Sequence, residues 1–280
     1  MLVSVPETPR LRPGPCPIPI TDVEASSEPR LVTGIEPIDR VLGGGLVVGS
    51  LILLGGEPGI GKSTLLAQLL AAVSCERVLY ASGEESITQV AMRARRVHAA
   101  YPRIQIVAET DVDSVLAHAE ELQPEVLAID SIHTLVTAAV ASMAGSVVQV
   151  RECTARLAAF AKSRNITTLV IGHVTKDGAL AGPKTLEHLV DVVLQFELGE
   201  HDGWRELRAH KNRFGSTLEI GSFEMTSIGL TPRDPASDQT PELPGALRSI
   251  TRELLERYLA LGGVIDAELA ARMERSQLMR

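Results

Sequence analysis

A glycine-rich loop between an apolar run and a helical pattern is the feature that most constrains this chain. The run is Leu51 to Leu54, and the helical pattern extends from about Lys62 to Val73. Glycines let backbone N–H groups wrap phosphate oxygens, and a helix N-terminus adds positive dipole. This order predicts a phosphate loop for a nucleotide and Mg²⁺, in which Lys62 reaches the outer phosphates and Ser63 ligates the metal. The residues expected to bind the nucleotide are Gly56, Glu57, Pro58, Gly59, Ile60, Gly61, Lys62, Ser63 and Thr64.

Short apolar runs and amphipathic stretches alternate through most of the chain after Leu31. Each run is short enough for a strand of a buried parallel sheet, with helices between the strands. Three later stretches, 191–198, 205–212 and 217–225, have no helix between them and are predicted to be antiparallel edge strands. The fold class is therefore α/β, with a mainly parallel sheet flanked by helices. The other expected strands are 51–54, 78–82, 104–107, 126–129 and 168–172, and the expected helices are 62–73, 87–97, 112–122 and about 147–160.

The two ends of the chain differ in composition from its centre. Residues 1–30 are rich in proline, which blocks helix formation, and they are predicted to form an extended arm. Residues 31–230 form the predicted domain, and 231–245, dense in proline and acid, form a linker. Apolar residues at helical spacing predict a short helical tail over 246–280. Two interpretations of this tail remain open: packing on the domain, or contact with a partner or another subunit.

Composition excludes several classes of protein. The 280 residues carry 35 acidic and 27 basic side chains, a formal net charge of −8, so binding to a polyanion must be local. The three cysteines have no CxxC spacing, which argues against a disulfide framework or a zinc site. The chain has neither an apolar run long enough for a membrane helix nor a signal peptide at its start. We therefore expect a cytoplasmic protein that binds neither membrane nor zinc.

Polar residues at three strand ends are candidates for chemistry on a nucleotide. Asp130 ends the run 126–129, where a carboxylate holds a metal ion through water. Glu84 follows the strand 78–82 and is placed to orient or deprotonate the attacking water. The alternative, that Glu84 and its neighbour Glu85 cap the next helix, stays open. His173 ends the strand 168–172; it is either a sensor of the γ-phosphate or an ordinary hydrogen-bonding residue.

With these motifs in view, the chain resembles the ATPase core of the bacterial RadA/Sms family, which is related to RecA and to hexameric helicases. The likeness runs from about Cys16 to Leu230, which is 215 of 280 residues. It is carried by VLYASGEES, LAIDSIHT, GSVVQVREC, GHVTKDGALAGPKTLEHLVDVVLQFE and HKNRFGSTLEIGSFEMTSIGL. The pentapeptide KNRFG, residues 211–215, is more specific to that family than the phosphate loop. The resemblance implies a RecA-like P-loop fold.

The resemblance also implies a role for each matching residue. Glu84 is similar to the carboxylate that activates water, Asp130 to the Walker B acid that holds Mg²⁺, and His173 to the strand-end sensor. Lys211 and Arg213 resemble the cations that reach the ATP of a neighbouring subunit. The family therefore implies a homo-oligomer, expected as a hexameric ring or a filament, because a lone subunit has an incomplete site. Without the family, Lys211 and Arg213 are ordinary solvated charges.

Two segments resemble the loops with which RecA-type proteins hold single-stranded DNA. They span Ala144 to Arg151 and Val174 to Lys184, and the cations that they offer to phosphate are Arg151, Lys176 and Lys184. Neither segment contains an aromatic residue, so base stacking is not the expected mode.

The chain departs from the family pattern in two places. It has no N-terminal four-cysteine zinc motif, and only about 50 residues follow Leu230, where RadA/Sms proteins carry a Lon-like domain. We therefore expect a trimmed paralogue or a core-only member, with a full-length relative or a recombinase as a candidate partner. The leading function is a DNA-coupled ATPase in recombination or repair. The alternatives are a KaiC-like regulatory switch acting on a protein, and a scaffold that co-assembles with a full-length relative.

Overall fold

The computed structural model describes residues 18–22, 28–173, 186–199 and 203–233. The chain divides into two compact units, Met1–Pro232 and Arg233–Arg280, and the fold below is that of the first. The predicted tail over 246–280, most of the predicted linker and the segment Val174 to Lys184 lie outside the described residues. Within the described residues, no helix combines the length and apolar character that crossing a membrane requires.

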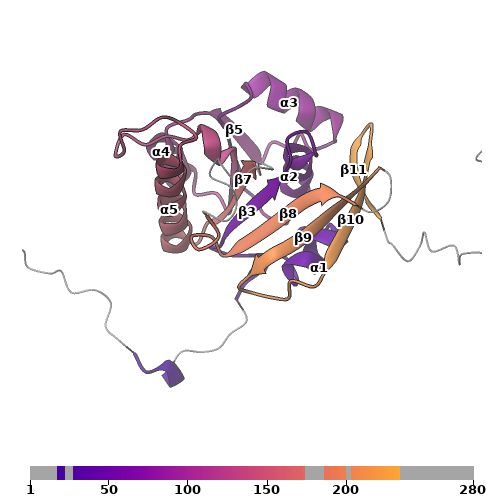
Figure 1. The fold of residues 1–280 in the computed structure, drawn as a ribbon, viewed down its shortest axis with the longest axis horizontal. Coiled ribbons are helices and arrows are strands. Elements are labelled where there is room, and N and C mark those ends of the chain that lie inside the picture. The colour runs from indigo at the N-terminus through magenta and orange to yellow at the C-terminus, as the bar shows by residue number, and fades with distance from the viewer. Residues whose placement is uncertain (1–17, 23–27, 174–185, 200–202, 234–280) are drawn as a thin grey trace, which may run out of the picture. The chain divides into compact units, whose positions relative to one another are not determined.

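A nine-stranded sheet forms the centre of the domain (Figure 1). Its order is β11-β10-β9-β8-β3-β7-β6-β4-β5. The pairs that join β8, β3, β7, β6, β4 and β5 are parallel, whereas β9 pairs antiparallel with both β8 and β10. The bounds are β3 Leu51–Gly56, β4 Val78–Ser82, β5 Ile104–Ala108, β6 Val126–Asp130, β7 Thr167–His173, β8 Val192–Leu198, β9 Trp204–Asn212, β10 Ile220–Thr226 and β11 Gly229–Arg233.

Helices cover both faces of the parallel part of the sheet (Figure 1). One core joins β3 to α1 (Glu36–Leu42), α2 (Lys62–Ala72) and α3 (Ile87–Arg96), and the other joins it to α4 (Val112–Leu122) and α5 (Val147–Arg164). Successive side chains of a strand point to opposite faces, so Ile52 and Leu54 enter the first core and Leu51 and Leu53 the second. Because both faces are buried, the parallel strands are continuous apolar runs.

Local sequence explains where three of these helices begin. Ser86 caps α3 in a reciprocal capping box with Gln89, Asp111 accepts from the backbone of Ser114 at α4, and Ser146 accepts from the backbone of Gln149 at α5. The α/β prediction is confirmed, since the strands and helices from residue 51 to residue 173 lie within two residues of their expected starts.

The structure corrects the sequence predictions at several points. Strand β8 is parallel to β3 on one side, so it is not a purely antiparallel edge strand. Strand β11 extends to Arg233, so the first three residues of the predicted linker belong to the sheet. The segment from Ala144 to Arg151 is half helical, because α5 begins at Val147. Sequence patterns missed α1, β11 and four short elements: β1 (Arg30–Leu31), β2 (Leu46–Val47), and the 3-10 turns η1 (Ile20–Asp22) and η2 (Ile132–Thr134).

Candidate nucleotide site

The glycine-rich loop lies where β3 ends and α2 begins, as its sequence predicts. Gly59 and Gly61 have φ angles of 79° and 114°, which only glycine adopts without strain. A Cβ on Gly56 would lie 2.3 Å from the carbonyl oxygen of Phe196 on the neighbouring strand. The Lys62 ammonium donates to the carbonyls of Gly56 and Glu57, at 2.9 Å each. The loop is therefore a closed turn of backbone around one buried cation.

A cleft of about 720 Å³ opens between this loop and α3. Its volume suits a nucleotide-sized ligand. Burial lowers the pKa of the Lys62 ammonium, and the nearby charges of Asp130 and Glu84 oppose that shift. Side chains that line the cleft include Ser63, Thr64, Glu84, Gln89, Met92 and Arg96.

The two candidate carboxylates lie where two neighbouring strands, β4 and β6, end at one edge of the sheet. Asp130 is the last residue of β6 and pairs with Ser82, the last residue of β4, while Glu84 follows two positions later. The Ser131 hydroxyl donates to the Glu84 carboxylate. The residue that caps α3 is Ser86, so the interpretation in which Glu84 caps this helix is wrong. We name this end of the sheet, with Gly56, Lys62, Glu84 and Asp130, the phosphate-loop edge.

A hydrogen-bonded chain holds Asp130 in place. The Tyr80 hydroxyl donates to the Asp130 carboxylate at 2.7 Å, and Arg93 of α3 donates to the Tyr80 oxygen at 3.0 Å. Arg93 also pairs with Glu85. Burial, with the neighbouring Asp130 charge, raises the pKa of Tyr80, so its hydroxyl keeps the proton that it donates. Sequence patterns missed Tyr80 and Arg93, because a tyrosine in an apolar strand and an arginine on a helix carry no motif.

The oxygen donors present suit Mg²⁺. The Ser63 hydroxyl lines the cleft and the Asp130 carboxylate lies at the same edge, and hard oxygen ligands are those that Mg²⁺ prefers. The register of β7 places His173 opposite Gly56 at this edge.

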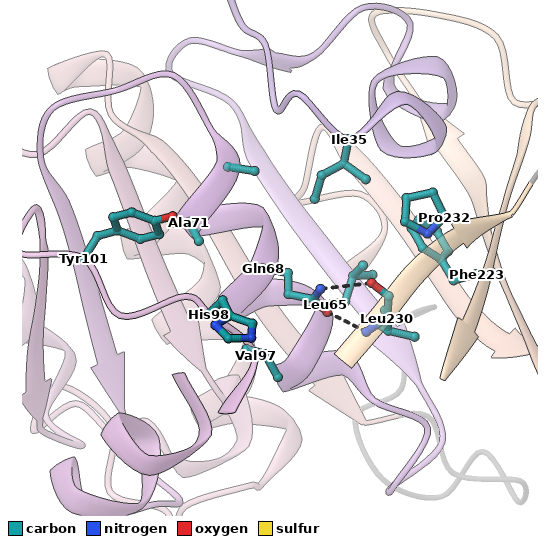
Figure 2. A pocket seen from close by; sticks show the side chains of 11 residues that line it. Ile35, Leu65, Gln68, Ala71, Val97, His98, Tyr101, Phe223, Leu230 and Pro232 are labelled. Carbon is teal, nitrogen blue, oxygen red and sulfur yellow. Dashed lines mark hydrogen bonds between the residues drawn. The ribbon is translucent and has the colours of Figure 1, made fainter. Parts of the chain in front are cut away.

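Helix α2, which follows the phosphate loop, is hydrogen-bonded to strand β11. Figure 2 shows the Gln68 amide of α2 joined by two hydrogen bonds to Leu230 of β11, and both residues line a second cavity of about 270 Å³. The Gln68 amide donates to the Leu230 carbonyl at 2.9 Å and accepts from the Leu230 N–H at 2.8 Å. Gly229 leaves room for this contact, since a Cβ there would lie 2.8 Å from the Gln68 side chain. Strand β11 therefore fixes the position of α2.

Lys211 and Arg213 lie together at the other end of the sheet. In register, Lys211 is level with Val193, and the Arg213 N–H donates to the carbonyl of Asp191, just before β8. The Lys211 ammonium donates to the carbonyls of Glu187 and Val190, the latter at 2.7 Å, and the Arg213 guanidinium pairs with Asp191 at 2.8 Å. We name this end, where β3 and β8 begin, the opposite edge.

The two edges are separated by the length of β3. The Asp191 N–H donates to Leu51, the first residue of β3, whereas the phosphate loop begins at Gly56. Five residues of strand span about 16 Å. The structure therefore brings Lys62, Glu84 and Asp130 together, and it separates Arg213 from them.

Of the three candidate DNA-contact residues, the structure describes one. Arg151 is exposed on α5, where it lines a separate hollow with Val147, Val148 and Leu189. Lys176 and Lys184 lie outside the described residues.

The fold and the loop define the class: a P-loop nucleotide-binding domain with a RecA-like sheet. A family model for the AAA domain matches residues 19–179. The DNA repair protein RadA of Bacillus subtilis is 51% identical over 217 residues, which are 77% of this chain and 47% of that protein. RadA of Pseudomonas aeruginosa is 50% identical over 75% of this chain and 47% of its own length.

The chain belongs to this AAA domain family, and the resemblance of its core to RadA is confirmed. It spans about half the length of the curated relatives that it matches. A KaiC-like protein from Pyrococcus horikoshii has the same fold, with a TM-score of 0.60 over 74% of this chain and 99% of that one, at 21% identity. Membership of this family, together with the phosphate loop, indicates an ATP hydrolase.

Proposed function

We propose that this chain is a Mg²⁺-dependent ATPase of DNA repair and recombination that assembles as a ring, expected as a hexamer, or as a filament. Its subunits complete each other's sites and couple hydrolysis to single-stranded DNA. The observation that carries the proposal is the position of Arg213, a KNRFG residue, at the opposite edge. An arginine side chain does not span the roughly 16 Å of β3 that separates Arg213 from its own phosphate loop.

In this proposal, the residues at the phosphate-loop edge act within one subunit. Lys62 leaves the carbonyls of Gly56 and Glu57 to bind the outer phosphates. Bound Mg²⁺, held by Ser63 and by Asp130 through water, supplies charge stabilisation at those phosphates. Glu84, oriented by the Ser131 hydroxyl, accepts a proton from the attacking water. The sensor role of His173 belongs to the same proposal.

The residues at the opposite edge act across the subunit interface. Arg213 is 48% exposed although it pairs with Asp191, so its guanidinium is accessible to a second molecule. Arg213 and Lys211 contact the nucleotide bound in a neighbouring subunit whose cleft faces this edge. There they stabilise transition-state charge. If Arg213 leaves, buried Asp191 keeps two other partners, Lys162 at 3.4 Å and the Leu51 N–H at 3.1 Å.

Relatives named as DNA repair proteins support the DNA half of the proposal. Exposed Arg151 supplies one phosphate contact, and Lys176 and Lys184 are proposed to supply others. Because a ring repeats each cation once per subunit, a few cations suffice in an acidic protein. A full-length RadA-like protein or a recombinase is the proposed protein partner.

The net charge of −8 favours a second candidate, a KaiC-like switch whose ATP state acts on a protein partner without DNA. One experiment separates the two: ATP turnover measured against protein concentration, with and without single-stranded DNA, beside Lys62→Ala as the blank. The leading proposal predicts turnover that rises more steeply than the protein concentration and increases with DNA. Turnover proportional to concentration contradicts the shared site, and turnover indifferent to DNA favours the switch.

A further inference from the structure

We infer that Arg30 is a positioning residue for the trans-acting cations: it fixes the turn that presents Arg213 to the neighbouring subunit. This inference rests on the proposed function, because Arg213 must act across an interface for its presentation to matter. The sequence alone placed Arg30 at the end of an extended arm, whereas the structure places it in β1, paired with Val47.

The Arg30 guanidinium joins the end of α1 to a turn that is remote from it in the sequence. One of its terminal nitrogens donates to the carbonyls of Leu42 and Gly45, at 3.0 and 3.2 Å, around the end of α1. The other donates to the carbonyl of Phe214 at 2.8 Å, 184 residues away. A planar guanidinium makes these bonds in fixed directions, so it sets the angle between the α1 terminus and the turn after β9.

The turn that holds Phe214 has further contacts with the same carbonyl cluster. The Asn212 amide donates to Leu42 at 3.5 Å and accepts from the Phe214 N–H at 2.9 Å. Gly215 lies beside Gly43, since a Cβ on either residue would be in ordinary van der Waals contact, 3.7 Å, with the Cα of the other. Arg213 lies between the two anchored residues, Asn212 and Phe214. Its backbone is therefore held from both sides while its side chain stays half exposed.

Arg30 itself does not reach a nucleotide in this arrangement. Its donors are directed at three backbone carbonyls, and it lies at the opposite edge with Phe214. Its effect on turnover therefore passes through Arg213. Misplacing a reacting group by about 1 Å costs up to 10²-fold in rate, so loss of this anchor predicts a large effect on kcat.

The first measurement compares Arg30→Ala with the wild-type protein. We expect kcat to fall about tenfold or more with the KM for ATP unchanged within about twofold, because the subunit's own cleft is intact.

Arg40→Ala is the matched control: Arg40 also donates to a carbonyl, that of Ile220, at 2.9 Å, but it anchors β10 rather than the turn. If Arg30→Ala does not fold, Arg30→Lys replaces it, since a lysine keeps the charge and loses the fork. Wild-type turnover in the folded variant overturns the inference.

The decisive measurement mixes two defective proteins, the impaired Arg30→Ala and the inactive Lys62→Ala. An Arg30→Ala subunit keeps an intact phosphate loop, and a Lys62→Ala subunit keeps an intact Arg213 turn. Random co-assembly then builds complete sites at about a quarter of the interfaces, so the mixture regains about a quarter of wild-type turnover. A defect inside the Arg30→Ala cleft is not rescued, because every intact phosphate loop in the mixture belongs to that subunit.

A parallel mixture separates this inference from the proposed function. Arg213→Ala mixed with Lys62→Ala must also regain activity if sites are shared between subunits. Rescue in both mixtures supports the inference. If only the mixture of Arg213→Ala with Lys62→Ala regains activity, the role of Arg30 is overturned and the shared site is supported. Failure of both mixtures, with co-assembly shown by pull-down of one variant through a tag on the other, overturns the proposed function and the inference together.

Discussion

The two edges of the sheet hold charged residues in different ways. At the phosphate-loop edge, buried Lys62 faces Asp130 and Glu84, and a hydrogen-bonded chain fixes the Asp130 carboxylate. At the opposite edge, Lys211 and Arg213 lie against backbone carbonyls and one buried carboxylate, with Arg213 half exposed. The first edge holds opposite charges around a cleft of nucleotide size, whereas the second presents two cations, of which Arg213 is half exposed. This difference suggests that one edge receives the nucleotide and the other acts on a nucleotide held elsewhere.

Lys62→Ala is expected to have the largest effect. The loop loses the cation that its backbone encloses, so ATP hydrolysis should fall to the blank rate. Steady-state phosphate release measures this loss. Turnover that survives the substitution would show that the nucleotide site does not lie at the phosphate-loop edge, so the two edges would not differ in the way described.

Arg213→Ala is expected to lower kcat by about 10³-fold or more while ATP binding stays nearly intact, as loss of an arginine finger does. Equilibrium binding of a fluorescent ATP analogue and single-turnover hydrolysis give the two quantities. Arg208→Ala is the matched control, since Arg208 is a partly exposed arginine of β9 that pairs with Glu206. A variant that hydrolyses ATP at the wild-type rate would show that the opposite edge takes no part in hydrolysis.

Tyr80→Phe is expected to lower turnover by about 10- to 100-fold, the size of effect typical of residues that orient a metal ligand. The change removes the hydroxyl that donates to Asp130 at 2.7 Å. We also expect a weaker Mg²⁺ dependence of nucleotide affinity, measured by titrating Mg²⁺ against a bound fluorescent nucleotide. Tyr101→Phe, at an exposed tyrosine, should behave as wild type. Equal Mg²⁺ titrations for Tyr80→Phe and wild type would contradict the positioning of Asp130.

Arg151→Ala and Lys176→Ala are expected to weaken single-strand binding several-fold and to reduce its salt dependence. Each lost phosphate contact lowers the slope of log K against log salt by about 0.7 for single strands. Fluorescence anisotropy over a salt series measures both quantities. Arg164→Ala is the control, because Arg164 is an exposed arginine at the far end of α5 that pairs with Glu120. Unaltered slopes in both test variants would place the DNA path elsewhere.

The smallest expected effect concerns the protonation of Lys211. Burial, and then the charge of Arg213, lowers the pKa of the Lys211 ammonium below the ordinary value of 10.5. The charged form therefore costs folding stability at neutral pH, and this cost disappears as pH rises through the lowered pKa toward 10.5. Arg213→Ala should raise the pKa of Lys211, which NMR titration of the lysine side chains measures. An unchanged pKa would show that the two cations do not interact.

Much of the phosphate-loop edge could be predicted from sequence, because its information is local. The turn needs glycines at fixed spacing, the strands before it and before Glu84 and Asp130 are apolar runs, and each run ends where its chemistry begins. Tyr80 and Arg93 could not be found in this way. Their contact with Asp130 depends on β4 lying beside β6 and on α3 lying over that edge, neither of which any run of residues encodes.

What the sequence determined by itself is the class of fold, the phosphate loop and the order of the main strands and helices between residues 51 and 173. These follow from periodicity and from backbone conformations that only glycine adopts freely. The tertiary structure decided that β8 lies parallel to β3, that Arg30 contacts Phe214 across 184 residues, and that Arg213 is about one strand length from its own phosphate loop. Such features depend on which strands become neighbours, which long-range packing settles and local pattern does not.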